Sequence, residues 1–209
     1  MTKYYAGVAA LAVVAGLGLT YALTLGGPGD PFDPCRASAI AGGPGDIGGP
    51  FTLVSETGET VTDAEVLDKP ALIYFGYTFC PDVCPLDTVR NADAVDVLAE
   101  SGHDVRPIFI SIDPKRDTPE VVDDFTANLH PEMLGLTGSE EQVAAASQAY
   151  RTYYKRHDGT GDEYYLVDHS TFTYLTLPGH GFVEFFHREM GPEAMAERTA
   201  CFIEAAASI

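Results

Sequence analysis

An uncharged apolar stretch over residues 4–25 constrains this chain more than any other feature of its sequence. About 20 such residues are enough to cross a bilayer as a helix, and small residues like those within the stretch are common in membrane spans. Lys3 precedes the stretch and every acidic residue follows it, an asymmetry that favours an amino terminus in the cytoplasm. We therefore expect residues 1–26 to form a single transmembrane helix that anchors an exported domain.

A cleaved signal peptide is the alternative interpretation of this segment. The apolar core of a signal peptide is usually about 7–15 residues long and is followed by a small-residue cleavage site. Here Leu25 is followed by GGPGDPFDP, which is a poor cleavage site, so a retained anchor is favoured. In both cases the rest of the chain faces the periplasm, or the mitochondrial intermembrane space if the source is eukaryotic. Residues 27–47, rich in Gly, Pro and Ala, are expected to form a tether.

Residues 48–209 have the pattern of one α/β domain. The expected strands are a hairpin over 51–62, buried strands over 71–77 and 105–112, and a second hairpin over 172–177 and 182–187. The expected helices cover 85–99, 119–129, 140–150 and 192–206, and the first of them has an apolar face of Leu86, Val89, Val95 and Leu98. Asp117, Thr118 and Pro119 have the composition of a helix start. This order suits a mixed sheet with helices on both faces.

Two cysteines separated by three residues carry the chemistry of this domain. Cys80 and Cys84 lie in the run FCPDVCP, between an expected buried strand and an expected helix. If the helix begins near Pro81, the two sulfurs lie about one turn apart on the same face. A helix N-terminus also favours thiolate over thiol and lowers the cysteine pKa. Thiolate is the form that binds metals and attacks disulfides, so both roles are open.

A histidine is the natural third ligand for such a pair. Two soft sulfurs favour Cu(I), Zn or iron–sulfur chemistry, and an imidazole completes a three-ligand site. We select His169, because it lies where a loop enters an expected strand and is thus held by a rigid element; the adjacent Asp168 is a candidate to orient its ring. The other histidines are expected at the surface: His103, His130, His157, His180 and His187. A purely structural or disulfide role for the two cysteines remains the alternative.

Three motifs in the same order resemble the Sco/SenC family of copper proteins involved in cytochrome c oxidase assembly. They are FGYTFCPDVCP, SIDPKRDTP and DHSTFTYL, and GGPFTL near Gly48 is also similar. The resemblance covers about residues 48–207. It implies a thioredoxin-like fold and copper ligands Cys80, Cys84 and His169. It also implies delivery of copper to the dinuclear copper centre of oxidase subunit II, with an upstream copper donor protein as a possible second partner.

Two functions fit these residues. The first is a copper chaperone, whose accessible three-ligand site releases its metal to a partner. The second is a thiol–disulfide reductase, in which Cys80 and Cys84 are the catalytic thiols and keep the oxidase cysteines reduced. A redox or copper sensor is a weaker third reading. The formal charge of −19 makes nucleic acid an unsuitable partner. Asp113 and Asp117 either form a turn and a helix cap or belong to a loop that borders the metal site.

The two remaining cysteines, Cys35 and Cys201, have no chemical partner in their own neighbourhoods in the sequence. One lies in the expected tether and the other in the last expected helix. Disulfides persist in exported domains, and an unpaired thiol there would risk exchange with Cys80 or Cys84. We therefore predict a disulfide between Cys35 and Cys201, which would tie the tether to the last helix.

Overall fold

The computed structural model describes residue 16 and residues 30–36, 47–157 and 165–209. The predicted membrane anchor, apart from Gly16, and most of the predicted tether lie outside these residues. No helix among the described residues is both long enough and apolar enough to cross a bilayer. The chain divides into two compact units, Met1–Pro34 and Cys35–Ile209. What is described of the first unit includes a turn in which the Phe32 N–H donates to Asp30 Oδ1, followed by the start of the short 3₁₀ helix η1 (Asp33–Cys35).

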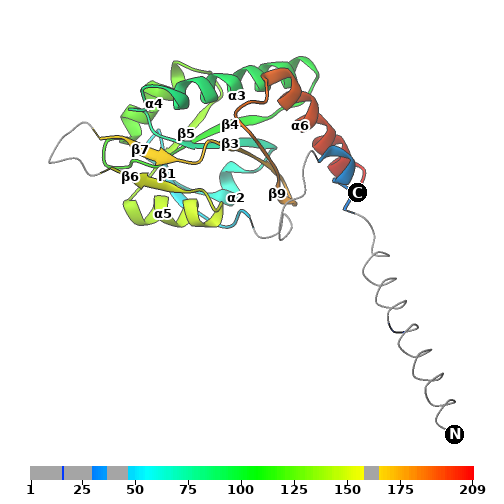
Figure 1. Cartoon of the computed structure of the whole chain (residues 1–209), viewed down its shortest axis with the longest axis horizontal. Helices are drawn as coiled ribbons and strands as arrows, with labels where there is room; N and C mark the ends of the chain where they lie inside the picture. The colour runs from blue at the N-terminus through cyan, green and yellow to red at the C-terminus, as the bar shows by residue number, and fades with distance from the viewer. Residues whose placement is uncertain (1–15, 17–29, 37–46, 158–164) are drawn as a thin grey trace, which may run out of the picture. The chain divides into compact units, whose positions relative to one another are not determined.

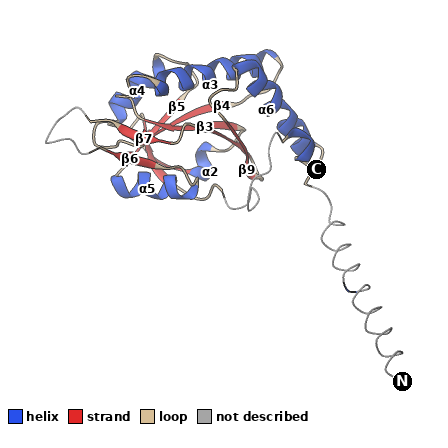
Figure 2. Cartoon of the chain, viewed as in Figure 1, coloured by secondary structure: helices blue, strands red, loops and turns tan. Residues whose placement is uncertain are grey.

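The second unit is built on a seven-stranded mixed sheet in the order β2-β1-β5-β4-β3-β8-β9 (Figures 1 and 2). The central pairs β3–β4 and β4–β5 are parallel, and all other neighbours in this sheet are antiparallel. A separate two-stranded antiparallel sheet is formed by β6 (Tyr154–Arg156) and β7 (Val167–His169). The strands of the main sheet are β1 (Thr52–Ser55), β2 (Thr60–Thr62), β3 (Ala71–Gly76), β4 (Arg106–Ser111), β5 (Leu134–Thr137), β8 (Thr173–Leu177) and β9 (Gly181–Phe186).

Helices cover both faces of the main sheet. Figure 1 shows α3, α4 and α6 on one side of it and α5 on the other. The predicted α/β class, a mixed sheet flanked by helices, is therefore confirmed. The helices are α2 (Asp63–Val66), α3 (Val83–Glu100), α4 (Pro119–Ala127), α5 (Glu140–Ala149) and α6 (Pro192–Ala207).

Local sequence signals explain where the helices begin. Thr118 precedes α4, and its side chain accepts a hydrogen bond from the backbone N–H of Val121, while Pro119 occupies the first turn. Ser139 forms a reciprocal capping box with Gln142 at the start of α5. The predicted start of α4 is thus confirmed, with Thr118 rather than Asp117 as the capping residue.

The core lies against β3, the strand that leads to the cysteine motif. All six residues of β3 are buried, since the strand is central in the sheet and covered on both faces. Aromatic rings dominate one side of this core: Phe75, Tyr150 and Tyr174 pack with ring centroids 5.5–5.8 Å apart. This packing fixes the end of β3, from which the functional loop departs.

The apolar face predicted for the first long helix is only half correct. Val95 and Leu98 are buried, but Leu86 and Val89 are exposed by 61% and 42%. The buried side of α3 carries the polar residues Asp87, Arg90 and Asn91 instead. The three polar side chains have hydrogen-bond partners in the interior. Leu86 and Val89 lie instead on the exposed side of the helix. Four further elements were not predicted: α2, β5 and the short polar strands β6 and β7.

The predicted disulfide between Cys35 and Cys201 is confirmed. The two residues are bonded with Cα atoms 5.7 Å apart and 166 residues apart in sequence. Arg36, next along the chain, donates a hydrogen bond to the carbonyl oxygen of Val183 in β9 and lies over the ring of Phe202 in α6. The start of the second unit is therefore tied covalently to α6.

Candidate metal centre

The loop that carries Cys80 is held in place by a buried carboxylate. Asp117 accepts hydrogen bonds from the Thr78 backbone N–H at 3.0 Å and from the Thr78 hydroxyl at 2.6 Å. It also accepts one from the Ser111 hydroxyl at 2.6 Å and is fully buried. The backbone of Cys80 in turn donates to the carbonyl oxygen of Tyr77. The turn expected at Asp113 and Asp117 is present, because the backbone N–H of Asp117 donates to the carbonyl oxygen of Asp113. The Asp117 side chain does not cap the helix and instead holds the loop that leads to Cys80.

Cys84 lies in the first turn of α3, and its backbone N–H lies 3.4 Å from Cys80 Sγ. The helix begins at Val83 rather than near Pro81, so Cys80 belongs to the preceding loop, and the two sulfurs are not placed one turn apart on one helix. Cys84 is fully buried and Cys80 is 8% exposed. Gly76 makes this packing possible, because a Cβ there would lie 2.8 Å from a ring carbon of Tyr74 and 3.2 Å from Cys84 Sγ.

The two thiols have opposite acidities. A hydrogen bond from the Cys84 thiol, together with backbone N–H groups at the start of α3, lowers the pKa of Cys80 to about 4 despite partial burial. The same hydrogen bond, followed by burial, raises the pKa of Cys84 well above its ordinary value. The prediction that the helix N-terminus lowers the cysteine pKa thus holds for Cys80 and is wrong for Cys84, because Cys84 is the donor of the pair.

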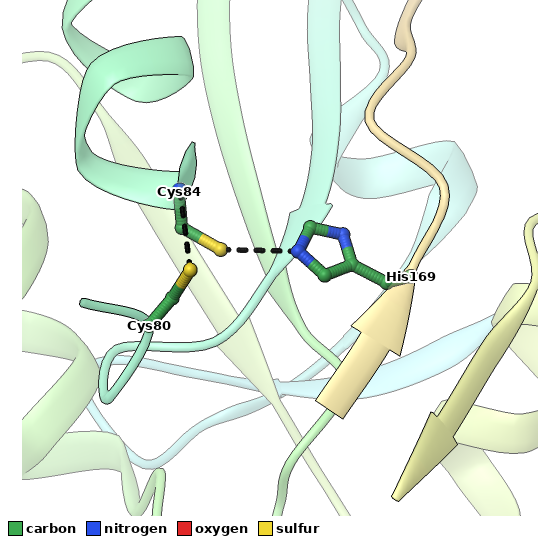
Figure 3. A group of neighbouring side chains, drawn as sticks. All are labelled: Cys80, Cys84 and His169. Atoms are coloured by element: carbon green, nitrogen blue, oxygen red, sulfur yellow. Dashed lines mark hydrogen bonds between the residues drawn. The ribbon is translucent and has the colours of Figure 1, made fainter. Parts of the chain in front are cut away.

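His169 reaches the cysteines from the other side of the site (Figure 3). It is the last residue of β7, and its Nε2 lies 3.3 Å from Cys84 Sγ. Its Nδ1 lies 2.9 Å from the carbonyl oxygen of Ser170, which can only accept, so Nδ1 carries the proton. In the neutral ring Nε2 then carries the lone pair that a metal ligand needs. Edge contacts with Tyr74 and Tyr77 enclose the ring.

Asp168 does not orient His169, contrary to our expectation. Its carboxylate pairs with Nε2 of the exposed His157 at 2.6 Å, because consecutive residues of a strand point to opposite faces. The carbonyl of Ser170 performs the orienting role instead. A second expectation also fails: His130 is buried, and its Nε2 lies 3.2 Å from Asp96 Oδ1.

A buried polar network behind the cysteines was not predicted from the sequence. The Tyr74 hydroxyl donates to Asp87 Oδ2 at 3.0 Å, and Arg90 lies 3.8 Å from the other carboxylate oxygen. Arg90 also donates to the Thr173 hydroxyl at 2.9 Å. Burial raises the pKa of Asp87, against the effect of Arg90 and Tyr74. Tyr74 and Asp87 are 13 residues apart and lie on different elements, so no local pattern in the sequence indicates that they meet.

The structure brings the three predicted ligands together. Their donor atoms, two sulfurs and one ring nitrogen, all lie within 4.8 Å of one another (Figure 3). Among the described residues, no other group of three or more histidine, cysteine or acidic side chains meets this criterion. Two thiolate sulfurs with one imidazole are a donor set that suits soft ions such as Cu(I). The geometry therefore fits a three-coordinate metal with little change in the side chains.

Comparisons with known proteins agree with this site. A family model described as SCO1/SenC matches residues 41–204. Protein SenC of Rhodobacter capsulatus is 52% identical over 208 residues, which is 98% of this chain and 92% of that protein.

Solved structures resemble the described fold closely. Arabidopsis thaliana ScoI with copper bound has a TM-score of 0.71 and 38% identity, covering 76% of this chain and 99% of that one. Bradyrhizobium japonicum ScoI with copper bound has a TM-score of 0.67 and 37% identity, covering 74% and 98%. The predicted thioredoxin-like fold is thereby confirmed. Since the family model matches residues 41–204, a range that includes the two cysteines and the histidine, the chain belongs to the SCO1/SenC family.

Proposed function

We propose that this protein is a copper chaperone that holds one copper ion through Cys80 Sγ, Cys84 Sγ and His169 Nε2. The observation that carries the proposal is the placement of these three donor atoms within 4.8 Å of one another. Two similar proteins have been solved with copper bound, and the family takes part in cytochrome c oxidase assembly. We further propose that it receives copper from an upstream donor protein and delivers it to the dinuclear copper centre of oxidase subunit II.

The arrangement of the ligands supports transfer rather than permanent storage. Cys84 is fully buried, whereas Cys80 and the half-buried His169 lie nearer to solvent. A three-coordinate ion leaves room for an incoming ligand, unlike a closed four-ligand site. A thiolate or imidazole from a partner can therefore join the copper ion before Cys80 or His169 leaves it. Delivery then proceeds by ligand exchange without release of the free ion.

The different acidities of Cys80 and Cys84 support a second candidate function, that of a thiol–disulfide reductase. Cys80 thiolate would attack a disulfide in the partner and form a mixed disulfide, releasing one partner thiolate. Cys84 would then lose its proton and attack the Cys80 sulfur, which releases the second partner thiolate. Two electrons pass to the partner, and a Cys80–Cys84 disulfide remains. The buried, protonated Cys84 fits the resolving role and Cys80 fits the attacking role.

One assay separates the two functions. The full chain, reduced and loaded with one equivalent of Cu(I), is mixed under argon with the metal-free copper domain of subunit II in either reduced or disulfide form. A chaperone passes copper to the reduced domain while Cys80 and Cys84 stay reduced. A reductase passes no copper but reduces the disulfide form and acquires one disulfide of its own. Copper that stays on this chain with both domain forms would contradict the proposed chaperone function.

We also propose that residues 1–26 are a retained membrane anchor, that 27–47 form a tether and that 48–209 are the copper-binding domain. The uncharged stretch over residues 4–25 and the position of Lys3 support the anchor and an exported domain. The mass of the chain extracted from membranes should therefore include residues 1–26. A mature chain that begins after residue 25 would instead identify a cleaved signal peptide.

A further inference from the structure

His169 lies at the end of β7, a strand that is not part of the main sheet. Among the residues that the structure describes, its strand, β7, pairs only with β6, and the two form a sheet separate from the main one. A two-stranded hairpin is marginally stable alone. Cys80 and Cys84, by contrast, follow a fully buried central strand. The distance from His169 to the cysteines must therefore be set by contacts between side chains that link the two parts.

Arg116 makes those contacts from the loop between β4 and α4. Its guanidinium carbon lies 3.6 Å from the ring centroid of Tyr165, 4.8 Å from that of Phe79 and 5.8 Å from that of Tyr77. Its Nε donates to Asp113 Oδ2 at 2.5 Å, and the side chain is 11% exposed. One cation thus packs against three aromatic rings and is held in place by a carboxylate.

The three rings belong to the two segments that bear the ligands. Tyr77 and Phe79 are in the loop that ends at Cys80, whereas Tyr165 is in the segment that leads into β7. The segments also contact each other directly, because the Val167 N–H donates to the Tyr77 hydroxyl at 3.3 Å. The Tyr77 ring meets the imidazole of His169 edge-on, with centroids 5.9 Å apart.

Asp113 contacts both Arg116 and Tyr165. It accepts a hydrogen bond from the Tyr165 hydroxyl at 2.5 Å with one oxygen and binds Arg116 with the other. It is almost fully buried, so this pair is shielded from solvent. Both ligand-bearing segments are therefore fastened to one loop, residues 113–117, through Arg116 and the two aspartates, Asp113 and Asp117.

We propose that Arg116 is a positioning residue that clamps the Cys80 loop to β7 and so keeps His169 within reach of Cys84. A planar, delocalised guanidinium can stack on several rings at once, whereas a lysine ammonium acts as a point charge. Without the clamp the cysteine loop stays in place through Asp117, and the weakly supported β7 moves away. The inference rests on the proposed copper function only for its metal readout.

The first test uses the metal-free protein. Arg116→Met is compared with Lys115→Met, which removes the same charge from the exposed neighbouring residue. Arg116→Met should speed amide hydrogen exchange at Val167 by more than tenfold and shift the His169 ring resonances in NMR spectra. Exchange at Thr78, which is held by Asp117, should change little. Lys115→Met should alter none of these. An unchanged Val167 amide and unchanged His169 ring in Arg116→Met would overturn the proposal.

The second test measures copper affinity in competition with a chelator. Arg116→Met should weaken Cu(I) binding by about 10–100-fold, as is typical when an outer-shell partner of a ligand is removed. Lys115→Met should bind Cu(I) like the wild type, because it removes the same charge without removing the guanidinium from the three rings. Equal losses of affinity in Arg116→Met and Lys115→Met, or no loss in Arg116→Met, would overturn the proposal.

A third variant covers the case in which Arg116→Met does not fold. Arg116→Lys keeps the ion pair with Asp113 and loses only the stacked plane. It should retain the fold while still loosening Val167 and His169, and a wild-type result for both would overturn the clamp. If the wild-type protein bound no copper, the proposed function would fail, whereas the exchange and NMR results would still decide the role of Arg116.

Discussion

Replacing Cys84 with serine should abolish stable copper binding. Cys84 Sγ lies 3.3 Å from His169 Nε2 and next to Cys80, so it is the central donor of the three. A serine hydroxyl is a hard oxygen that stays protonated at neutral pH, and Cu(I) prefers soft sulfur. The loss of affinity should exceed the roughly 10–100-fold expected for removal of an outer-shell residue. Equilibrium competition with a Cu(I) chelator measures it.

Cys80→Ser and His169→Ala should likewise abolish stable copper binding while leaving the fold largely intact. A matched control is His187→Ala, because the His187 ring packs against Phe172 and Phe185 rather than the cysteines. That variant should bind copper like the wild type. Wild-type affinity in His169→Ala would remove His169 from the site and leave a two-sulfur centre. Thermal unfolding of each metal-free variant shows whether a loss of binding reflects a loss of fold.

Removing the disulfide between Cys35 and Cys201 should destabilise the folded domain without changing the metal site. The bond joins residues 166 apart, so it restricts a large part of the unfolded chain. Loss of a native disulfide typically lowers the free energy of unfolding by about 2–5 kcal/mol, and the chain-entropy model places long loops at the upper end. Cys35→Ser/Cys201→Ser should therefore unfold at a lower denaturant concentration than the wild type, while its copper stoichiometry stays the same.

The double substitution is the appropriate variant for this experiment. A single Cys35→Ser would leave the Cys201 thiol free to exchange with Cys80, and the two effects would be confused. Denaturant unfolding of the metal-free proteins, followed by circular dichroism, gives the difference in free energy. Equal midpoints and slopes for the double variant and the wild type would show that the bond contributes nothing to stability.

Much of the sheet could be predicted from the sequence, because its strands are strongly apolar. β3 is one residue shorter than predicted at its carboxyl end, and β4 is one residue shorter at each end. α5 and α6 differ from the predicted helices by one residue at the carboxyl end. β6 and β7 could not be predicted: they are three residues long, partly charged and hydrogen-bonded to each other as strands across a separation of more than ten residues. Such pairing depends on residues that are distant in sequence and have no period of their own.

The candidate ligands could be identified from residue types and from the resemblance to a family, but their surroundings could not. Nothing in the sequence indicates that Ser170 rather than Asp168 orients His169, since this depends on which face of β7 each residue occupies. The opposite acidities of Cys80 and Cys84 arise from which sulfur donates a hydrogen bond to the other, and the sequence does not specify this. The role of Arg116 could not be predicted either, because the three aromatic rings that it contacts come from segments distant in sequence.

X-ray absorption spectroscopy of the protein with one equivalent of Cu(I) tests the central claim most directly. The measurement reports the number and type of atoms bound to the metal, independently of affinity. The proposed site predicts two sulfur ligands and one imidazole nitrogen in the wild type, and the same three ligands in the control variant His187→Ala. A wild-type spectrum without an imidazole ligand or with fewer than two sulfurs, or an imidazole signal that is lost in His187→Ala, would contradict copper binding by Cys80, Cys84 and His169.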